Sequence, residues 1–110
     1  MEEFNPCYAI SPLDGRYNED TKEFRQIASE FGLMKARVII EVEYLDALVS
    51  ELKINGEIKR DFTIKEISKL RNIYKNFSLS DFKRIKEIEK ITGHDVKAVE
   101  YFLKEKVKEL

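Results

Sequence analysis

The chain has 110 residues and a formal net charge of −1, and 43% of its residues are hydrophobic and 37% are charged. This composition is typical of a folded, helix-rich domain with a modest core, and the balanced charge disfavours nucleic-acid binding, which needs a basic excess. The single Cys7 cannot form an internal disulfide, and the sequence has neither a secretory signal nor an apolar run that would span a bilayer. We therefore expect a soluble, cytoplasmic protein.

The first eighteen residues differ from the others. The segment NPCYAISPLDGRY holds both prolines and one glycine, which indicates extended chain and turns. Asp14 and Gly15 predict a tight turn that presents Arg16 and Tyr17 side by side. Arginine offers a planar fork for phosphate or carboxylate, and tyrosine adds a ring and a hydroxyl. A polar turn without any ligand explains the pattern as well, and the pattern alone favours that simpler explanation.

The rest of the chain has helical periodicity. A short helix is predicted over residues 19–30, and a long one of about 22 residues, or about 33 Å, is predicted within residues 29–53. Ile39 and Ile40 widen the apolar stripe of the long helix beyond one face. A helix of this length is large for so small a domain, which predicts a surface that another chain or domain covers. The packing seam of this helix consists of Phe31, Met34, Val38, Val42, Leu45, Val49 and Leu52.

Three further helices are expected after a turn at Asn55 and Gly56. The first begins with a capping box formed by Thr63 and Glu66, and the second restarts at Ser80. The expected inward residues are Ile67, Leu70, Tyr74 and Phe77, then Phe82, Ile85 and Ile88, and in the last helix Val96, Val99, Leu103, Val107 and Leu110. Strand-like alternation is hard to find, so we predict an all-α fold, a small helical domain with one long helix.

The segment TGHD contains the only histidine, His94. Thr92 and Asp95 have capping-box spacing, which places His94 in the first turn of the last helix. Free backbone N–H groups and the positive end of the helix dipole favour an anion there, and Gly93 leaves the backbone open to a ligand. Alternatively, His94 is an ordinary polar residue at a helix end and Asp95 only a cap, which the spacing alone favours. The sequence shows no metal-ligand spacing, glycine-rich phosphate loop or nucleophile–base pair.

Three segments in order, SPLDGRY, SEFGLMKARVIIEVEYL and RIKEIEKITGHDVKAVEYFLKEKV, carry a resemblance that covers nearly the whole chain. Together they resemble the amino-terminal domain of the adenylosuccinate lyase family, a branch of the fumarase/aspartase superfamily. The resemblance implies one helical domain over residues 1–110, in which residues 1–18 form an extended substrate-binding arm and turn. It also implies that the central and carboxy-terminal lyase domains are absent from this chain.

The resemblance implies a reaction as well. Members of the family eliminate fumarate from adenylosuccinate to give AMP, and from the succinyl-carboxamide ribotide SAICAR to give AICAR, in purine biosynthesis. A base removes the proton next to a carboxylate and an acid protonates the departing nitrogen, without a metal or organic cofactor. The active sites are shared among the subunits of a homotetramer, which assembles through the central domain.

The resemblance also assigns roles to residues. Arg16 and Tyr17 are implied to lie against the phosphate end of the substrate, while Gly93, His94 and Asp95 line the substrate site. Members often have asparagine where this chain has Gly93. The general acid of the family is a histidine in the next domain and its base is a serine on a mobile loop, and neither motif is present here. We therefore expect His94 to bind and orient more than to transfer a proton, and the chain alone to be inactive.

Two alternatives stay open at this stage. The chain could belong to another lyase of the superfamily, such as argininosuccinate lyase or a fumarase, although the pairing of SPLDGRY with HDVKAVEYF disfavours this. It could also be a free-standing helical interaction module that descends from such a domain. Assays with the competing substrates, and the mass of the native protein, separate these alternatives.

Overall fold

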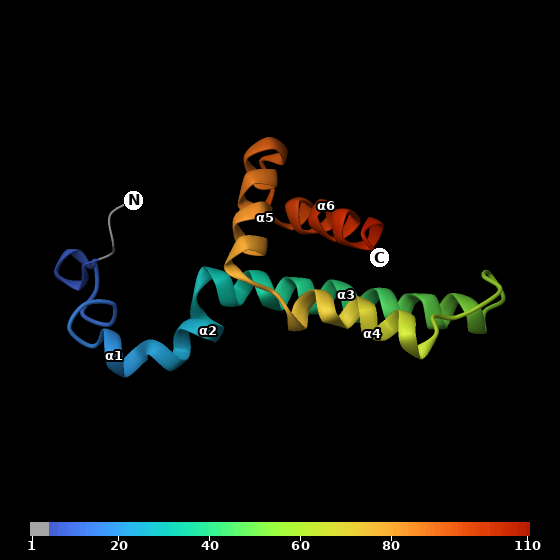
Figure 1. The fold of residues 1–110 in the computed structure, drawn as a ribbon, viewed down its shortest axis with the longest axis horizontal. Helices are drawn as coiled ribbons and strands as arrows, with labels where there is room; N and C mark the ends of the chain where they lie inside the picture. Colours follow the sequence, from blue (N-terminus) through green and yellow to red (C-terminus); the bar gives the residue numbers. More distant parts are fainter. Residues whose placement is uncertain (1–4) are drawn as a thin grey trace. The chain divides into compact units, whose positions relative to one another are not determined.

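The computed structural model describes residues 5–110, which are helical and contain no β-strand, so the predicted all-α fold is confirmed (Figure 1). The chain divides into two compact units at Leu33 and Met34, and each is described by itself. The single domain with an arm over residues 1–18 stays a prediction, and residues 1–4 of that arm lie outside the described part. The elements are η1 (Pro6–Tyr8), α1 (Asn18–Thr21), η2 (Lys22–Phe24), α2 (Arg25–Ala28), α3 (Glu30–Ile54), α4 (Ile64–Lys75), α5 (Leu79–Thr92) and α6 (Asp95–Lys108).

The first unit contains shorter helices than the sequence predicted. Residues 19–30 were expected to form one helix, but the 3-10 helix η2 separates two short α-helices, α1 and α2, and Ser29 separates α2 from α3. The hydroxyl of Thr21 donates to the carbonyl oxygens of Leu13 at 3.0 Å and Asn18 at 3.2 Å, and Arg25 also donates to Asn18 O at 2.5 Å. Side chains that bond to nearby backbone groups in this way compete with the regular helical pattern. The prediction of one helix was therefore wrong.

The boundary between α2 and α3 depends on Ser29 and Gly32. Ser29 has an extended backbone, and its hydroxyl oxygen accepts from the N–H of Gly32 at 3.0 Å, which caps the start of α3. A Cβ atom at Gly32 would lie 2.6 Å from the carbonyl oxygens of both Gln26 and Ile27. Only glycine therefore allows the chain to turn this closely on the end of α2.

The long helix α3 is confirmed, and it runs for 25 residues. Its seam is most deeply buried at Met34, Val38 and Val42. The other seam residues are half-buried, namely Phe31, Leu45, Val49 and Leu52. Ile40 and Tyr44, by contrast, are 66% and 62% exposed, which agrees with the expected uncovered apolar surface. Of the helices in residues 5–110, none is long and apolar enough to cross a membrane.

Helix α4 runs back along α3 (Figure 1). The predicted capping box is confirmed, because Thr63 Oγ1 accepts from Glu66 N and Glu66 Oε1 accepts from Thr63 N. Across the two helices, Arg71 Nε donates to Glu43 Oε1 at 2.9 Å and the Tyr74 hydroxyl donates to the same oxygen at 2.7 Å. These two hydrogen bonds, Arg71 first, lower the pKa of the Glu43 carboxyl.

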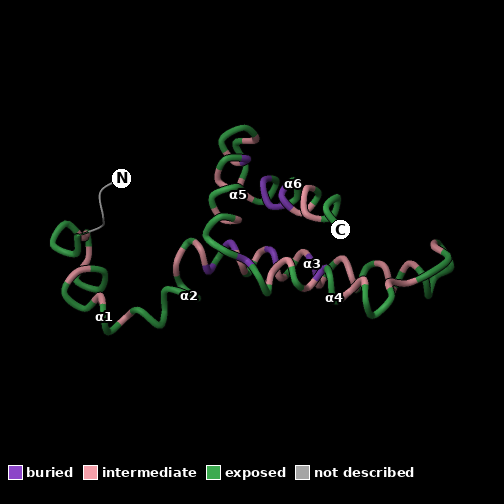
Figure 2. Tube along the Cα trace, in the orientation of Figure 1, coloured by how far each residue is buried: buried purple, intermediate pink, exposed green. Residues whose placement is uncertain are grey.

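Helices α5 and α6 pack against each other and hold much of the core (Figure 2). The first of them begins at Leu79, capped by Ser78, so it starts slightly before the predicted Ser80. The Phe102 ring is fully buried and meets the edge of Phe77, with the ring centroids 6.1 Å apart and the planes at 89°. The other buried side chains of this pair are Ile85, Ile88, Ala98 and Val99.

The predicted stripe of α6 holds at Val99, which is buried, and in part at Leu103, which is half-buried, but it was wrong at the other three positions. Val96, Val107 and Leu110 are 39%, 46% and 56% exposed, whereas Ala98 and Phe102 are fully buried. The buried face of α6 is thus formed by Ala98, Val99 and Phe102, and Phe102 meets Phe77 there. The larger aliphatic residues were mistaken for the core because hydropathy alone does not show which face meets a neighbouring helix.

Candidate functional site

In the first unit, Arg16 and Tyr17 lie together at the end of a series of turns. The carbonyl of Ser11 accepts from Asp14 N at 3.1 Å and from Gly15 N at 2.9 Å, and Pro12 O accepts from Tyr17 N at 2.9 Å. The Arg16 guanidinium carbon lies 5.3 Å from the centroid of the Tyr17 ring, a cation–π distance. The predicted side-by-side arrangement of this pair is confirmed.

Gly15 is required for a different reason than its turn suggests. Its φ angle is not positive, so the backbone conformation does not demand glycine. A Cβ atom there would lie 3.0 Å from Pro6 O and 3.3 Å from both Ala9 Cβ and Ser11 O. The missing side chain therefore lets the backbone at Gly15 lie close to the backbone of Pro6 and Ser11. Around them, a shallow depression of about 490 Å³ is lined by two prolines, three small residues, Ile10, Arg16 and Tyr17.

In the second unit, the chain turns sharply between α5 and α6. Gly93 has a left-handed backbone with φ of 67° and ends α5, and its N–H donates to Glu89 O at 2.7 Å. Glycine and asparagine are the residues that most readily adopt this conformation. A Cβ atom at Gly93 would meet nothing within 4 Å, so the space beside this backbone is open.

The position of His94 differs from the prediction. Thr92 is the last residue of α5 and His94 is the N-cap of α6, whereas a Thr92 cap would have placed His94 in the first turn. The Thr92 hydroxyl instead accepts from His94 N at 3.2 Å and donates to His94 O at 3.0 Å. The capping-box reading of Thr92 and Asp95 was therefore wrong, because the left-handed Gly93 ends one helix before the next begins.

The His94 ring serves as the cap of α6. Its Nδ1 accepts from Lys97 N at 3.3 Å, so a neutral ring carries its proton on Nε2. The side chain is 67% exposed, which leaves Nε2 open to a ligand. The ring can thus hold the helix start with one nitrogen and offer a hydrogen-bond donor with the other.

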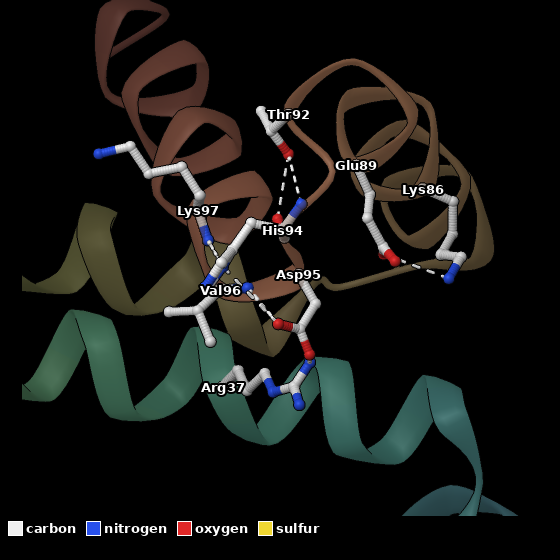
Figure 3. A network of polar contacts seen from close by, with 8 residues as sticks. All are labelled: Arg37, Lys86, Glu89, Thr92, His94, Asp95, Val96 and Lys97. Carbon is white, nitrogen blue, oxygen red and sulfur yellow. Dashed lines mark hydrogen bonds and ion pairs between the residues drawn. The ribbon is translucent and has the colours of Figure 1, made fainter.

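Asp95 is held by two groups (Figure 3). Its Oδ1 accepts from Val96 N at 2.9 Å, and its Oδ2 lies 2.9 Å from Nη1 of Arg37 on α3. The Val96 N–H chiefly, together with the positive charge of Arg37, lowers the pKa of the Asp95 carboxyl. Sequence analysis missed Arg37, because nothing in the pattern of α3 connects it with a residue so far along the chain.

The structure thus brings Gly93, His94 and Asp95 together, and separately Arg16 and Tyr17, with each set in a different unit. Cys7 is exposed and unpaired with another cysteine. Within residues 5–110, no three histidine, cysteine, aspartate or glutamate side chains are grouped to hold a metal ion.

Comparison with known proteins identifies relatives over nearly the whole chain. The adenylosuccinate lyase of Haemophilus influenzae is 52% identical over 99 residues, which cover 90% of this chain and 21% of that protein. The adenylosuccinate lyase of Escherichia coli K12 is 47% identical over 108 residues, or 98% of this chain and 23% of that protein. The chain is homologous to one segment of the adenylosuccinate lyases.

Similarity of this kind is not confined to bacteria. The adenylosuccinate lyase of Dictyostelium discoideum is 47% identical over 108 residues, covering 96% of this chain and 22% of that protein. No protein-family model matches the chain. The chain spans about a fifth of the length of the curated relatives it matches. The resemblance recognised in the sequence is confirmed.

Proposed function

We propose that this chain is the amino-terminal domain of an adenylosuccinate lyase, which eliminates fumarate from adenylosuccinate to give AMP and from SAICAR to give AICAR. The observation that carries the proposal is the identity of 45–52% to several adenylosuccinate lyases over 90% or more of the chain. The proposal extends to a cytoplasmic homotetramer that assembles through domains outside this chain.

The proposed role of this domain is to bind substrate. Arg16 offers a permanent positive charge to the phosphate end, with Tyr17 beside it. Gly93 leaves room for the substrate to approach the backbone, and the exposed Nε2–H of His94 suits an oxygen or nitrogen acceptor of the substrate. Asp95 completes this set at the start of α6.

The chemistry itself is assigned to other parts of the protein. A β-elimination needs a base for the proton next to the carboxylate and an acid for the departing nitrogen. His94 is the only histidine, and its Nδ1 is already engaged by Lys97 N, so we assign it an orienting role. The chain alone therefore has no lyase activity.

The test is turnover by the full-length protein that contains this chain. Release of fumarate from both adenylosuccinate and SAICAR, with none from argininosuccinate, supports the proposal. Activity on argininosuccinate instead would place the protein in another branch of the superfamily. Turnover by the purified 110-residue chain would contradict the assignment of acid and base to other domains, and a native protein that ends at Leu110 would support the interaction module.

A further inference from the structure

An ion pair connects the long helix α3 to the first residue of α6. Nη1 of Arg37 lies 2.9 Å from Oδ2 of Asp95, and the two side chains are 30% and 45% exposed. In Figure 3, Arg37 extends from α3 and its guanidinium ends at the Asp95 carboxylate. Because the partners lie on different helices, the pair connects the corner at the start of α6 to α3.

The same carboxylate is oriented from its other side. Oδ1 of Asp95 accepts from Val96 N at 2.9 Å, within the first turn of its own helix. The two oxygens are therefore fixed by two different elements, α6 through the N–H of Val96 and α3 through Arg37. A carboxylate held in this way has little freedom to rotate.

The adjacent residue is His94, whose ring is directed by the same turn. Its Nδ1 accepts from Lys97 N at 3.3 Å and lies 3.8 Å from Oδ1 of Asp95. Any shift of Asp95 relative to α3 moves this turn and, with it, the direction in which Nε2 points. The orientation of the His94 Nε2–H thus depends on Arg37, a side chain on another helix.

We propose that Arg37 is a positioning residue, which acts through Asp95 to fix the start of α6 and the direction of the His94 Nε2–H. The proposal rests on the proposed function for its kinetic consequence, because the substrate is what His94 would orient. Arg37 itself does not contact substrate in this proposal, so its effect disappears when Asp95 can no longer pair with it.

The chain offers a matched control in Arg71. Its Nε lies 2.9 Å from Glu43 Oε1, and it joins α3 to α4 with both side chains 39% exposed. The distance and exposure resemble those of the Arg37 pair, but none of residues 92–97 takes part. Arg71 Nη2 also lies 3.2 Å from Glu43 Oε2 and 3.5 Å from Asp46 Oδ2. Arg71→Ala therefore removes at least as much ion pairing with α3 as Arg37→Ala does, without changing a residue at the start of α6.

The kinetic test uses the full-length protein and adenylosuccinate. Arg37→Ala should lower kcat/KM about fivefold, near the upper limit for a partly exposed pair, and Arg37→Lys should restore part of the loss. Asp95→Asn should lower kcat/KM at least as much, because Asp95 also belongs to the proposed substrate-binding set. The double variant should be no worse than the worse single variant, because both changes break one interaction. Arg71→Ala should leave kcat/KM unchanged.

Two results would overturn the proposal. If Arg37→Ala lowers kcat/KM by the same factor in the Asp95→Asn background, Arg37 acts on the substrate directly or by another route. If Arg71→Ala lowers it as much as Arg37→Ala does, the effect is general loss of stability.

A second measurement does not depend on activity. The N–H groups of Val96 and Lys97 donate to the side chains of Asp95 and His94. The hydrogen-exchange rate of these two amides should rise about fivefold in Arg37→Ala and stay unchanged in Arg71→Ala. Unchanged exchange in Arg37→Ala would overturn the positioning role. If the wild-type protein turns over neither substrate, the proposed function fails, yet this exchange still decides what Arg37 does.

Discussion

The two units of the chain are stabilised in different ways. The buried hydrophobic side chains of the described residues all lie at Met34 or beyond it. In the first unit, large apolar side chains are exposed, among them Ile10, Phe24 at 64% and Ile27 at 78%. That unit is held by backbone hydrogen bonds of turns and short helices. The second unit has a packed core, whereas residues 5–33 of the first unit contain no buried hydrophobic side chain.

This difference bears on function, because each unit contributes candidate substrate-binding residues. A stretch with few buried apolar contacts opens locally at low cost in free energy, whereas a packed core opens only with the whole unit. Arg16 and Tyr17 therefore lie on a segment that opens at low cost in free energy. His94 lies at the turn between α5 and α6, next to the packed core of the second unit. Substitutions in the two units should separate affinity from stability.

Phe102→Ala should cause the largest loss of unfolding free energy, and only the second unit should be destabilised. Truncation of a fully buried aromatic ring costs about 3–5 kcal/mol of unfolding free energy, and Phe102 is 0% exposed and packs against Phe77. Phe24→Ala is the control in the first unit, with a change within about 0.5 kcal/mol, because Phe24 is mostly exposed. Urea denaturation followed by circular dichroism measures both, and equal losses would refute the difference between the units.

His94 should affect both stability and activity. In the full-length protein, His94→Ala should lose most of the activity, by roughly tenfold to a hundredfold, as expected for a lost hydrogen bond to a charged group. It should also cost about 1 kcal/mol of stability, because the cap of α6 is lost. His94→Gln keeps a donor and should retain part of the activity.

The sharper variant is His94→Asn. Asparagine is a good N-cap, so it should restore stability, but its shorter side chain cannot place a donor where Nε2 lies. We expect a stable protein that is about as inactive as the alanine variant, measured by fumarate release and by thermal unfolding. Full activity of His94→Ala would leave His94 as a helix cap alone. An inactive but folded His94→Gln would favour proton transfer.

Arg16→Ala should change affinity with little change in stability. A charge-assisted contact to an anion contributes about 1.5–3 kcal/mol, so KM should rise roughly tenfold to a hundredfold while kcat changes less. Lysine should rescue it only in part, because it lacks the planar fork. Michaelis constants for both succinylated substrates provide the measurement, and unchanged values would remove Arg16 from the substrate site.

The sequence was most informative where the signals were local. The capping box of Thr63 and Glu66 and the turn at Gly56 depend on residues close together in the chain, and both were predicted correctly. The interruption of residues 19–30 and the inward face of α6 depend on contacts from elsewhere, such as Thr21 with Leu13. Those contacts cannot be obtained from periodicity.

The candidate site shows the same limit. The pairing of Arg16 with Tyr17 follows from their adjacency, and the exposure of His94 agrees with its place at a helix end. The contribution of Arg37 does not follow, because it requires α3 to pass beneath the start of α6. The roles of these residues came from the family resemblance and not from their spacing.

The smallest predicted effect is on the stability of the protein at acidic pH. Arg60 Nη1 donates to Glu66 Oε1 at 2.7 Å, and this bond first, then the Thr63 N–H, lowers the pKa of Glu66 from its ordinary 4.5 to about 2. Because the folded pKa lies below the unfolded one, the unfolded state binds more protons between these values. The stabilisation is therefore fully present above about pH 4.5 and is lost as pH falls through about 2.

Glu66→Gln should accordingly make stability less dependent on pH between about 4.5 and 2, since glutamine does not titrate in this range. Arg60→Ala should produce part of the same flattening, because the Thr63 N–H still lowers the pKa of Glu66. Both carboxylate contacts lie at the start of α4, so the acid-dependent change should appear in the unfolding of the second unit. Urea midpoints measured across this pH range test it, and an unaltered slope in Glu66→Gln would show that other carboxylates control the acid response.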